Sequence, residues 1–343
     1  IIPYKPDPID RRYQYLPGGK IPDESLKLRK LGQDDVHGVL DLPADYTITA
    51  VQAKATLDAL ERLKSKKFII SCSFHCPHVP ITPSEPYASM YRAADMKAPA
   101  SINDGRSNSP YKPNPVEQPY TDPKNIGFMT ANYYAFVTEI DDWVGKILDK
   151  LDELGLSKNT VVVFLSDHGE MLGAHGMRGK FCFYEESVRV PFIIRYPGKI
   201  KPGLKIDTPV SLVNIFPTIL DYAGLKNIPT DGFSLKPVIE GSDLPYDFAI
   251  SEWSWKNLNV PSLMIRTGDW KLMTTHREGG KNIEALYDLK NDPNEINNLL
   301  GSNPERFKYE KIAEELRSKL VKYLAMHNSP LTEGVSKREL IRK

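Results

Sequence analysis

The sequence feature that most constrains the fold is the stretch from residue 160 to residue 180, TVVVFLSDHGEMLGAHGMRGK. Its first six residues are all apolar or β-branched, which is typical of a strand buried on both faces of a parallel sheet. The strand is followed at once by the polar group Ser166-Asp167-His168-Gly169-Glu170. Ligand sites in open α/β sheets lie just beyond the carboxyl ends of strands, so the sequence predicts a functional site here.

Asp167 and His168 are the candidate metal ligands of this site. Neighbouring residues of a regular strand point to opposite faces, but both side chains can converge on one ion where the backbone turns. Lys180 adds a compact cation suited to an anionic substrate. The residues alone leave open the plainer interpretation that Asp167 and His168 form only a polar turn.

A second stretch repeats this pattern. Residues 68–74 (FIISCSF) predict a buried strand, and polar residues follow it in the string His75-Cys76-Pro77-His78-Val79-Pro80. Helical spacing before this strand predicts a helix over residues 49–66 with Thr47 or Thr49 as its N-cap. A second amphipathic helix is predicted over residues 132–154, ended by Gly155. The alternation of strands and helices predicts βαβ units and a parallel sheet.

The pattern changes after about residue 249. The short alternating segments AISEW, SLMIRTGDWKLMT and EALYDL predict an antiparallel sheet, and residues 304–326 predict a terminal amphipathic helix. Between the two patterns, a strand is predicted over residues 190–195 and a helix over residues 213–223. We therefore expect two domains, a larger α/β domain over residues 1–245 and an α+β subdomain over residues 246–343.

Composition narrows the possible partners. The 45 basic and 44 acidic side chains give a formal net charge of +1, so we expect no nucleic-acid or membrane partner and only local attraction for anions. The cysteines are too few for a disulfide framework and are interpreted as small buried side chains or one bridge: Cys72, Cys76 and Cys182. No stretch approaches the ~20 apolar residues of a membrane span.

Several other polar groups have a plainer interpretation than a site. We read Asp34-Asp35-Val36-His37 as a solvated loop, Asp141-Asp142 as a solvated helix face, and Asp292-Pro293-x-Glu295 as a turn before a helix. Residues 79–125 form a long loop region, of a kind that is usually functional or disordered. Its tyrosines either stack on a sugar or aryl ring or simply cover the surface: Tyr87, Tyr111 and Tyr120.

The string SDHGEMLGAHGMRGK, followed by YEESVRVPFII at residues 184–194, closely resembles the sulfatase family of the alkaline-phosphatase superfamily. The resemblance extends over nearly the whole chain. It implies a mostly parallel central sheet flanked by helices, with a small C-terminal antiparallel sheet and helix. It also implies a metal-dependent sulfuric ester hydrolase that removes sulfate from a sulfated small molecule or polysaccharide, in a periplasmic, secreted or lysosomal location.

The resemblance implies a role for each candidate residue. Asp167 and His168 are expected to hold the metal, Lys180 to bind the sulfate oxygens, and His78 to bind sulfate and assist the leaving oxygen. His175 and, with less support, His75 are expected to contact substrate. Ca²⁺ is the expected ion, because such sites are usually rich in oxygen. Many sulfatases have Asn at the position of His168, and a nitrogen ligand also admits Mn²⁺ or Zn²⁺, besides Mg²⁺.

The nucleophile of the family is a formylglycine made from the first residue of a C/S-x-P-x-R motif. None of the three cysteines begins such a motif, and we expect no serine of this chain to supply it either. The chain resembles the back two-thirds of a sulfatase, so we expect the formylglycine in a missing N-terminal segment or a companion N-terminal chain. Two alternatives stay open: a phosphonate or phosphate ester hydrolase of the same superfamily, and a non-catalytic glycan- or anion-binding fragment.

Overall fold

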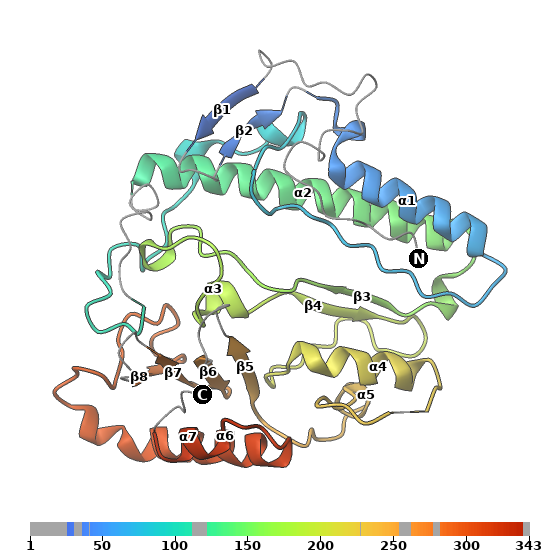
Figure 1. The fold of residues 1–343 in the computed structure, drawn as a ribbon. Helices are drawn as coiled ribbons and strands as arrows, with labels where there is room; N and C mark the ends of the chain where they lie inside the picture. Colours follow the sequence, from blue (N-terminus) through green and yellow to red (C-terminus); the bar gives the residue numbers. More distant parts are fainter. Residues whose placement is uncertain are drawn as a thin grey trace. The chain divides into compact units, whose positions relative to one another are not determined.

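The computed structural model of the protein describes residues 26–30, 36–40, 42–111, 122–226, 228–253, 262–276 and 282–338 (Figure 1). Asp34, Asp35 and Tyr120 lie outside the described residues. The chain divides into two compact units, the first made of residues 1–98 and 115–160, the second of residues 99–114 and 161–343. The expected domain boundary after residue 245 therefore falls inside the second unit. Within the described residues, no helix has the length and apolar character needed to cross a bilayer.

The first unit is built on two long helices. Helix α1 (Ile48–Leu63) begins at Thr47, whose Oγ1 accepts a hydrogen bond from the Ala50 backbone at 3.2 Å. Helix α2 (Pro123–Glu153) runs alongside α1 in Figure 1. The chain leaves α2 through Gly155, which adopts a φ of +68° that favours glycine. Both expected helices are thus confirmed. The smaller elements of this unit are β1 (Leu26–Lys30), β2 (Val36–Leu40), η3 (Ala44–Tyr46), η4 (Tyr87–Ser89), η5 (Ala93–Asp95) and η7 (Ser157–Asn159).

The prediction of a buried strand over residues 68–74 is wrong in the structure. This segment is extended, but it has no ladder partner among the described strands, and Ile69 is 84% exposed. Only part of it joins the core: Phe74 packs with Phe136 and Ile140 of α2. An apolar run becomes a strand only when a neighbouring backbone pairs with it, and residue types alone do not reveal that neighbour.

In the second unit, one strand directly precedes the candidate-site loop in the sequence and another follows it. Strand β3 (Val162–Leu165) pairs with β4 (Phe192–Arg195), with Val163 opposite Ile194. The pairing is antiparallel, as is every ladder among the described strands. It differs from the parallel order expected locally, because the chain between β3 and β4 turns back on itself. The apolar side chains are not covered on both faces either, since Phe164 is 36% and Ile193 59% exposed.

The rest of this part of the second unit is made of short helices. Helix α4 (Ile215–Tyr222) lies over one face, where Ile219 lines a small apolar cavity together with Val163 and Ile194. The remaining elements of this part are η8 (Ala174–Gly176), α3 (Glu185–Val188), η9 (Leu212–Asn214) and α5 (Lys236–Ile239). The expected helix over residues 213–223 is therefore present as η9 followed by α4.

The expected C-terminal antiparallel sheet is confirmed. Strands β5 (Ala249–Trp253), β6 (Ser262–Arg266), β7 (Trp270–His276) and β8 (Asn282–Asp288) follow one another in sequence order. One face packs against helix α6 (Glu310–Met326) through Leu263, Ile265, Leu272 and Leu286, while the other packs against residues 171–184 through Met264, Met273, Ala285 and Tyr287. The sheet therefore supports the candidate-site loop directly. The chain is completed by η10 (Arg306–Lys308) and α7 (Thr332–Ser336).

Candidate functional site

Asp167 and His168 lie in the turn just beyond β3, where the strand pattern predicted a site. The Asp167 side chain is 83% exposed, and its Oδ1 accepts a hydrogen bond from the His168 backbone at 2.9 Å. The His168 Nδ1 lies 2.9 Å from the Gly169 carbonyl oxygen. A carbonyl only accepts, so Nδ1 carries a proton, and Nε2 is the ring nitrogen left for a further partner.

The geometry of this pair fits a shared metal ion. Oδ2 of Asp167 and Nε2 of His168 are 3.4 Å apart. Two ligand atoms each ~2.0–2.4 Å from one ion, at roughly a right angle, are separated by about 3 Å. No cluster of three or more candidate metal ligands occurs among the described residues, and this turn brings together two donor atoms. One oxygen and one nitrogen donor are compatible with Ca²⁺, Mn²⁺ or Zn²⁺.

Lys180 stands at the other end of the same loop and is half-buried. The loop is closed by Glu170, whose Oε1 accepts hydrogen bonds from the backbones of Gly179 at 2.6 Å and Leu172 at 3.4 Å. A backbone hydrogen bond of 2.9 Å from Met171 to Gly179 reinforces the closure. Burial raises the pKa of Glu170, and the loop's amide donors oppose that rise. Glu170 thus fixes the residue directly before Lys180.

His175 lies in the interior of this loop. Its side chain is fully buried, and Nδ1 is paired with the carboxylate of Asp104. The ring stacks on Tyr184 with 3.7 Å between centroids, and the backbone nitrogen donates to Ser101 Oγ at 3.1 Å. Nε2 is buried without a hydrogen-bond partner among the described residues. These contacts fit a residue that fixes the loop, and the substrate contact expected for His175 stays a prediction.

His78 and His75 belong to the first unit. Both are exposed, and their ring centroids are 5.1 Å apart. The His78 Nδ1 lies 2.9 Å from the Val79 carbonyl oxygen, which leaves Nε2 as the atom available to a substrate. The His75 backbone nitrogen donates to Gln52 Oε1 at 3.2 Å. The expected roles of both histidines stay predictions.

The tyrosines of the long loop region do not form an open stacking platform. Tyr87 is 5% exposed, and its hydroxyl donates to Asp142 at 2.8 Å. Tyr111 packs edge-on against Tyr184, and its hydroxyl oxygen accepts a hydrogen bond from the Phe183 backbone at 3.0 Å. Burial raises the pKa of Tyr111 well above its usual range. Both rings contribute to the interior of their own unit, which fits neither interpretation made from the sequence.

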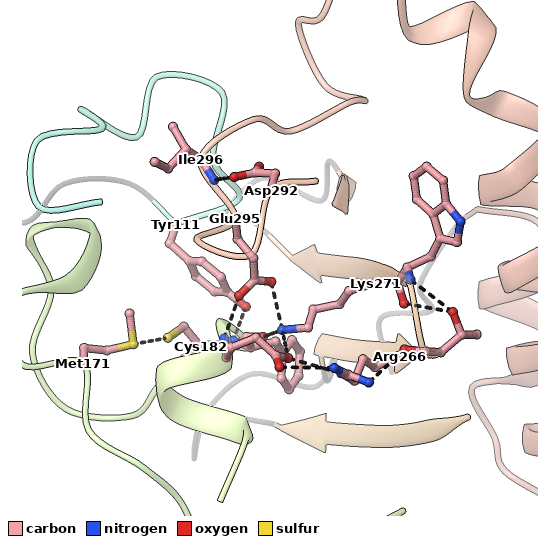
Figure 2. A network of polar contacts seen from close by, with 12 residues as sticks. Tyr111, Met171, Cys182, Arg266, Lys271, Asp292, Glu295 and Ile296 are labelled. Atoms are coloured by element: carbon pink, nitrogen blue, oxygen red, sulfur yellow. Dashed lines mark hydrogen bonds and ion pairs between the residues drawn. The ribbon is translucent and has the colours of Figure 1, made fainter. Parts of the chain in front are cut away.

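A buried charge network beside the loop was missed from the sequence. Lys271 of β7 and Glu295 are both almost completely buried and pair at 2.8 Å (Figure 2). Glu295 has a φ of +52° in a turn that is held by Asp292, which accepts from Ile296 at 3.1 Å and from Asn297 at 2.8 Å. The turn at Asp292 was expected, but the helix expected directly after it is absent, since residues 295–298 are irregular. Lys271 was missed because a lysine inside an alternating strand is usually interpreted as solvent-facing. The buried partner gives no sequence signal.

One serine matches the letters of the nucleophile motif, against our expectation. Residues Ser302-Asn303-Pro304-Glu305-Arg306 read S-x-P-x-R. Ser302 is exposed, and both its backbone nitrogen and its hydroxyl donate to Asn108 Oδ1, at 2.7 and 2.9 Å. This hydroxyl joins the 99–114 segment to the C-terminal part and does not lie on the loop of Asp167. The match therefore adds no nucleophile to the candidate site.

Comparison with known proteins identifies the family. The sulfatase profile ("Sulfatase") matches residues 9–225, and a profile for the N-sulphoglucosamine sulphohydrolase C-terminal region matches residues 173–326. The chain therefore belongs to the sulfatase family, which confirms the resemblance and the alkaline-phosphatase-like α/β fold class.

Individual relatives agree with this assignment. The chain is similar to an arylsulfatase of Clostridium perfringens, with 32% identity over 81% of this chain and 58% of that protein. Arylsulfatase K of Xenopus laevis is 35% identical over 58% of this chain and 38% of its own length. The phosphonate monoester hydrolase of Agrobacterium radiobacter has a similar structure, with a TM-score of 0.70 and 25% identity over 84% of this chain and 62% of that one. The chain thus matches only about two-fifths to three-fifths of these proteins' lengths.

Proposed function

We propose that this chain is part of a metal-dependent sulfuric ester hydrolase that removes sulfate from a sulfated carbohydrate or a related sulfate ester. The observation that carries the proposal is the pair of donor atoms on Asp167 and His168, 3.4 Å apart beyond β3, on the same closed loop as Lys180. Membership of the sulfatase family supports the same chemistry. The family's formylglycine is proposed to lie outside these 343 residues.

Each residue has a defined task in this proposal. Asp167 and His168 hold the ion, which polarises the sulfate oxygens when bound. The Lys180 ammonium neutralises charge that develops on the same oxygens, and His78 Nε2 gives a proton to the leaving oxygen. Ca²⁺ is the proposed ion, and the imidazole of His168 makes Mg²⁺, Mn²⁺ or Zn²⁺ the alternatives to test. By family likeness, a periplasmic, secreted or lysosomal location is proposed.

Metal binding can be tested apart from turnover. The protein is stripped with chelator and unfolded thermally in a series of Ca²⁺, Mg²⁺, Mn²⁺ and Zn²⁺ concentrations. A ligand at 100 times its Kd stabilises the folded state by about 2.7 kcal/mol. The wild type should gain this stability with at least one ion, and Asp167→Asn should lose most of it. Asp149→Asn, a change at an exposed carboxylate of α2, is the matched control and should respond like the wild type. An equal response in all three proteins refutes the ligand role.

The ester specificity is tested on the protein isolated from its native source. A peptide map reveals whether a C/S-x-P-x-R peptide with the mass of formylglycine accompanies this chain. Initial rates are then compared for 4-nitrophenyl sulfate, 4-nitrophenyl phosphate and a phenyl phosphonate ester. The proposal requires the highest kcat/KM on the sulfate. Preference for the phosphonate supports the alternative favoured by the likeness to the phosphonate monoester hydrolase. No turnover of any ester supports a non-catalytic anion-binding role.

A further inference from the structure

The loop that carries Asp167, His168 and Lys180 is tied to α3 at both ends. The Gly169 backbone nitrogen donates to the Ser187 carbonyl oxygen at 2.8 Å. The Ser187 hydroxyl donates to the Lys180 carbonyl oxygen, also at 2.8 Å. Ser187 is 2% exposed, so both bonds are protected from water. The position of α3 therefore sets the positions of both ends of the loop.

The contact at Gly169 is unusually close. A Cβ at this position would lie 1.9 Å from the Glu186 carbonyl oxygen and 3.5 Å from the Ser187 Cα. Only glycine allows the loop backbone to approach α3 in this way. We therefore expect a small displacement of α3 to displace the backbone at Gly169 as well.

Helix α3 has four residues and cannot hold its own position, because so short a helix is not stable alone. It is anchored through its first residue. The Glu185 carboxylate pairs with Lys271 at 2.7 Å and more loosely with Arg266 at 3.4 Å. The Glu185 backbone nitrogen donates to Glu295 Oε2 at 2.6 Å. Every one of these partners lies in the C-terminal part of the chain.

Lys271 is the centre of this anchor (Figure 2). Its side chain is fully buried, and its ammonium group contacts three acceptors: Glu185 Oε1 at 2.7 Å, Glu295 Oε1 at 2.8 Å and the Phe183 carbonyl oxygen at 2.8 Å. The contact with the Phe183 carbonyl is a hydrogen bond, and the two carboxylate contacts are ion pairs. Although burial alone would raise it, Lys271 and Arg266 hold the pKa of Glu185 below its usual value. Removing Lys271 would leave two buried carboxylates without their shared cation.

We propose that Lys271 is a positioning residue for the candidate site: it fixes α3 through Glu185 and Glu295, and α3 fixes the loop of His168 and Lys180. The C-terminal sheet then does more than pack against the loop, because the ammonium group of Lys271 also links β7 to α3. This inference rests on the proposed function only for its catalytic consequence. The geometric part concerns the loop itself and can be measured without turnover.

The same subdomain offers a matched control. Arg317 of α6 is also a buried cation, 3% exposed, and it pairs with Glu284 at 2.7 Å. Its second partner is Glu314, one turn earlier on the same helix. Loss of either cation breaks a buried ion pair and should destabilise the fold. The two substitutions differ in which helix loses an ion pair. Removing Arg317 affects α6, whereas removing Lys271 affects α3.

The experiment compares Lys271→Met with Arg317→Met in the complete protein by hydrogen–deuterium exchange. Amides of Gly169, Met171 and Gly179 close the loop, so peptides covering residues 167–180 report its order. Exchange in these peptides should rise at least tenfold in Lys271→Met and stay within twofold of wild type in Arg317→Met. Both are measured at a temperature where each variant is more than nine-tenths folded. If Lys271→Met does not fold, Lys271→Met/Glu295→Gln, which removes one unpaired charge, takes its place.

Equal exchange in the two variants, or unchanged exchange in Lys271→Met, overturns the proposal. The catalytic consequence is measured separately with 4-nitrophenyl sulfate. Lys271→Met should lower kcat at least tenfold and leave KM within threefold, because it misplaces groups without removing any. Arg317→Met should keep both constants near wild type. A wild-type protein without sulfate ester turnover refutes the proposed function, whereas the exchange comparison still decides the role of Lys271.

Discussion

Glu139 makes the stability of the first unit depend on pH. This residue of α2 has no exposed surface, and its carboxylate is hydrogen-bonded to Thr47, the N-cap residue of α1. Burial raises the pKa of Glu139 from 4.5 to about 7, and the hydrogen bond from Thr47 offsets only part of that rise. The protonated form therefore favours the folded state. This contribution to stability is fully present below pH 4.5 and is lost as the pH rises through 7.

The size of the effect follows from the two pKa values. At ~1.36 kcal/mol per pH unit, a rise from 4.5 to about 7 corresponds to about 3.4 kcal/mol in total. Because part of this is already lost at pH 5, the loss between pH 5 and pH 8 is about 2.5 kcal/mol. Glu139→Gln keeps the shape of the side chain and removes the titration. We expect the free energy of unfolding of the wild type to fall by about 2.5 kcal/mol more than that of Glu139→Gln over this range.

Native-state hydrogen exchange of the α2 peptides measures this free energy for the first unit alone. Asp149→Asn, at an exposed carboxylate of the same helix, is the control and should follow the wild type at both pH values. The comparison between variants cancels the pH dependence of every other group. The reasoning is refuted when the free energy of unfolding of Glu139→Gln falls as much as that of the wild type, or more.

Three further predictions concern the site. Gly169→Ala places a methyl group 1.9 Å from the Glu186 carbonyl oxygen, so the unfolding midpoint should fall by several degrees; an unchanged midpoint in thermal unfolding contradicts the close contact. Asp104→Asn weakens the partner of buried His175 and should cost about 1–3 kcal/mol in urea unfolding, whereas a neutral result means that the pair is not ionic. Lys180→Ala should lower turnover on the order of 10²-fold or more with little change in stability, and turnover within a few-fold of wild type removes Lys180 from the site.

Hydrophobic periodicity predicted the elements whose partners are close in sequence. Thr47 as N-cap and Gly155 as the end of α2 were readable because both depend on local hydrogen bonds and on φ. The alternating segments after residue 249 also predicted the antiparallel sheet, in which Leu263 and Ile265 of β6 pack against α6 and Met264 lies on the opposite face. The pairing of β3 with β4 and the unpaired state of residues 68–74 depend on distant backbone, which no local pattern encodes.

The sequence predicted the residues of the candidate site that follow a strand locally, but not their distant partners. Asp167 and His168 were found because they follow an apolar strand, and the structure brings their donor atoms to within 3.4 Å. The burial of His175 on Asp104 was not foreseen, since nothing marks one aspartate among many as a distant partner. Lys271 was missed for the same reason. A charged side chain is expected to face solvent unless its buried partners are known, and these partners are distant in sequence.

The segment of residues 99–114 has a consequence for how this chain can be made. It belongs to the second unit, yet it is encoded between the two parts of the first. During synthesis, all residues of the first unit have been translated once residue 160 has been added. At that point Asp104 and Asn108 have been translated, but their partners His175 and Asn298 have not. A gene split at any single point therefore separates at least one unit into pieces or leaves the later unit without Asp104. To express the second unit alone, residues 99–114 would have to be supplied as an added segment.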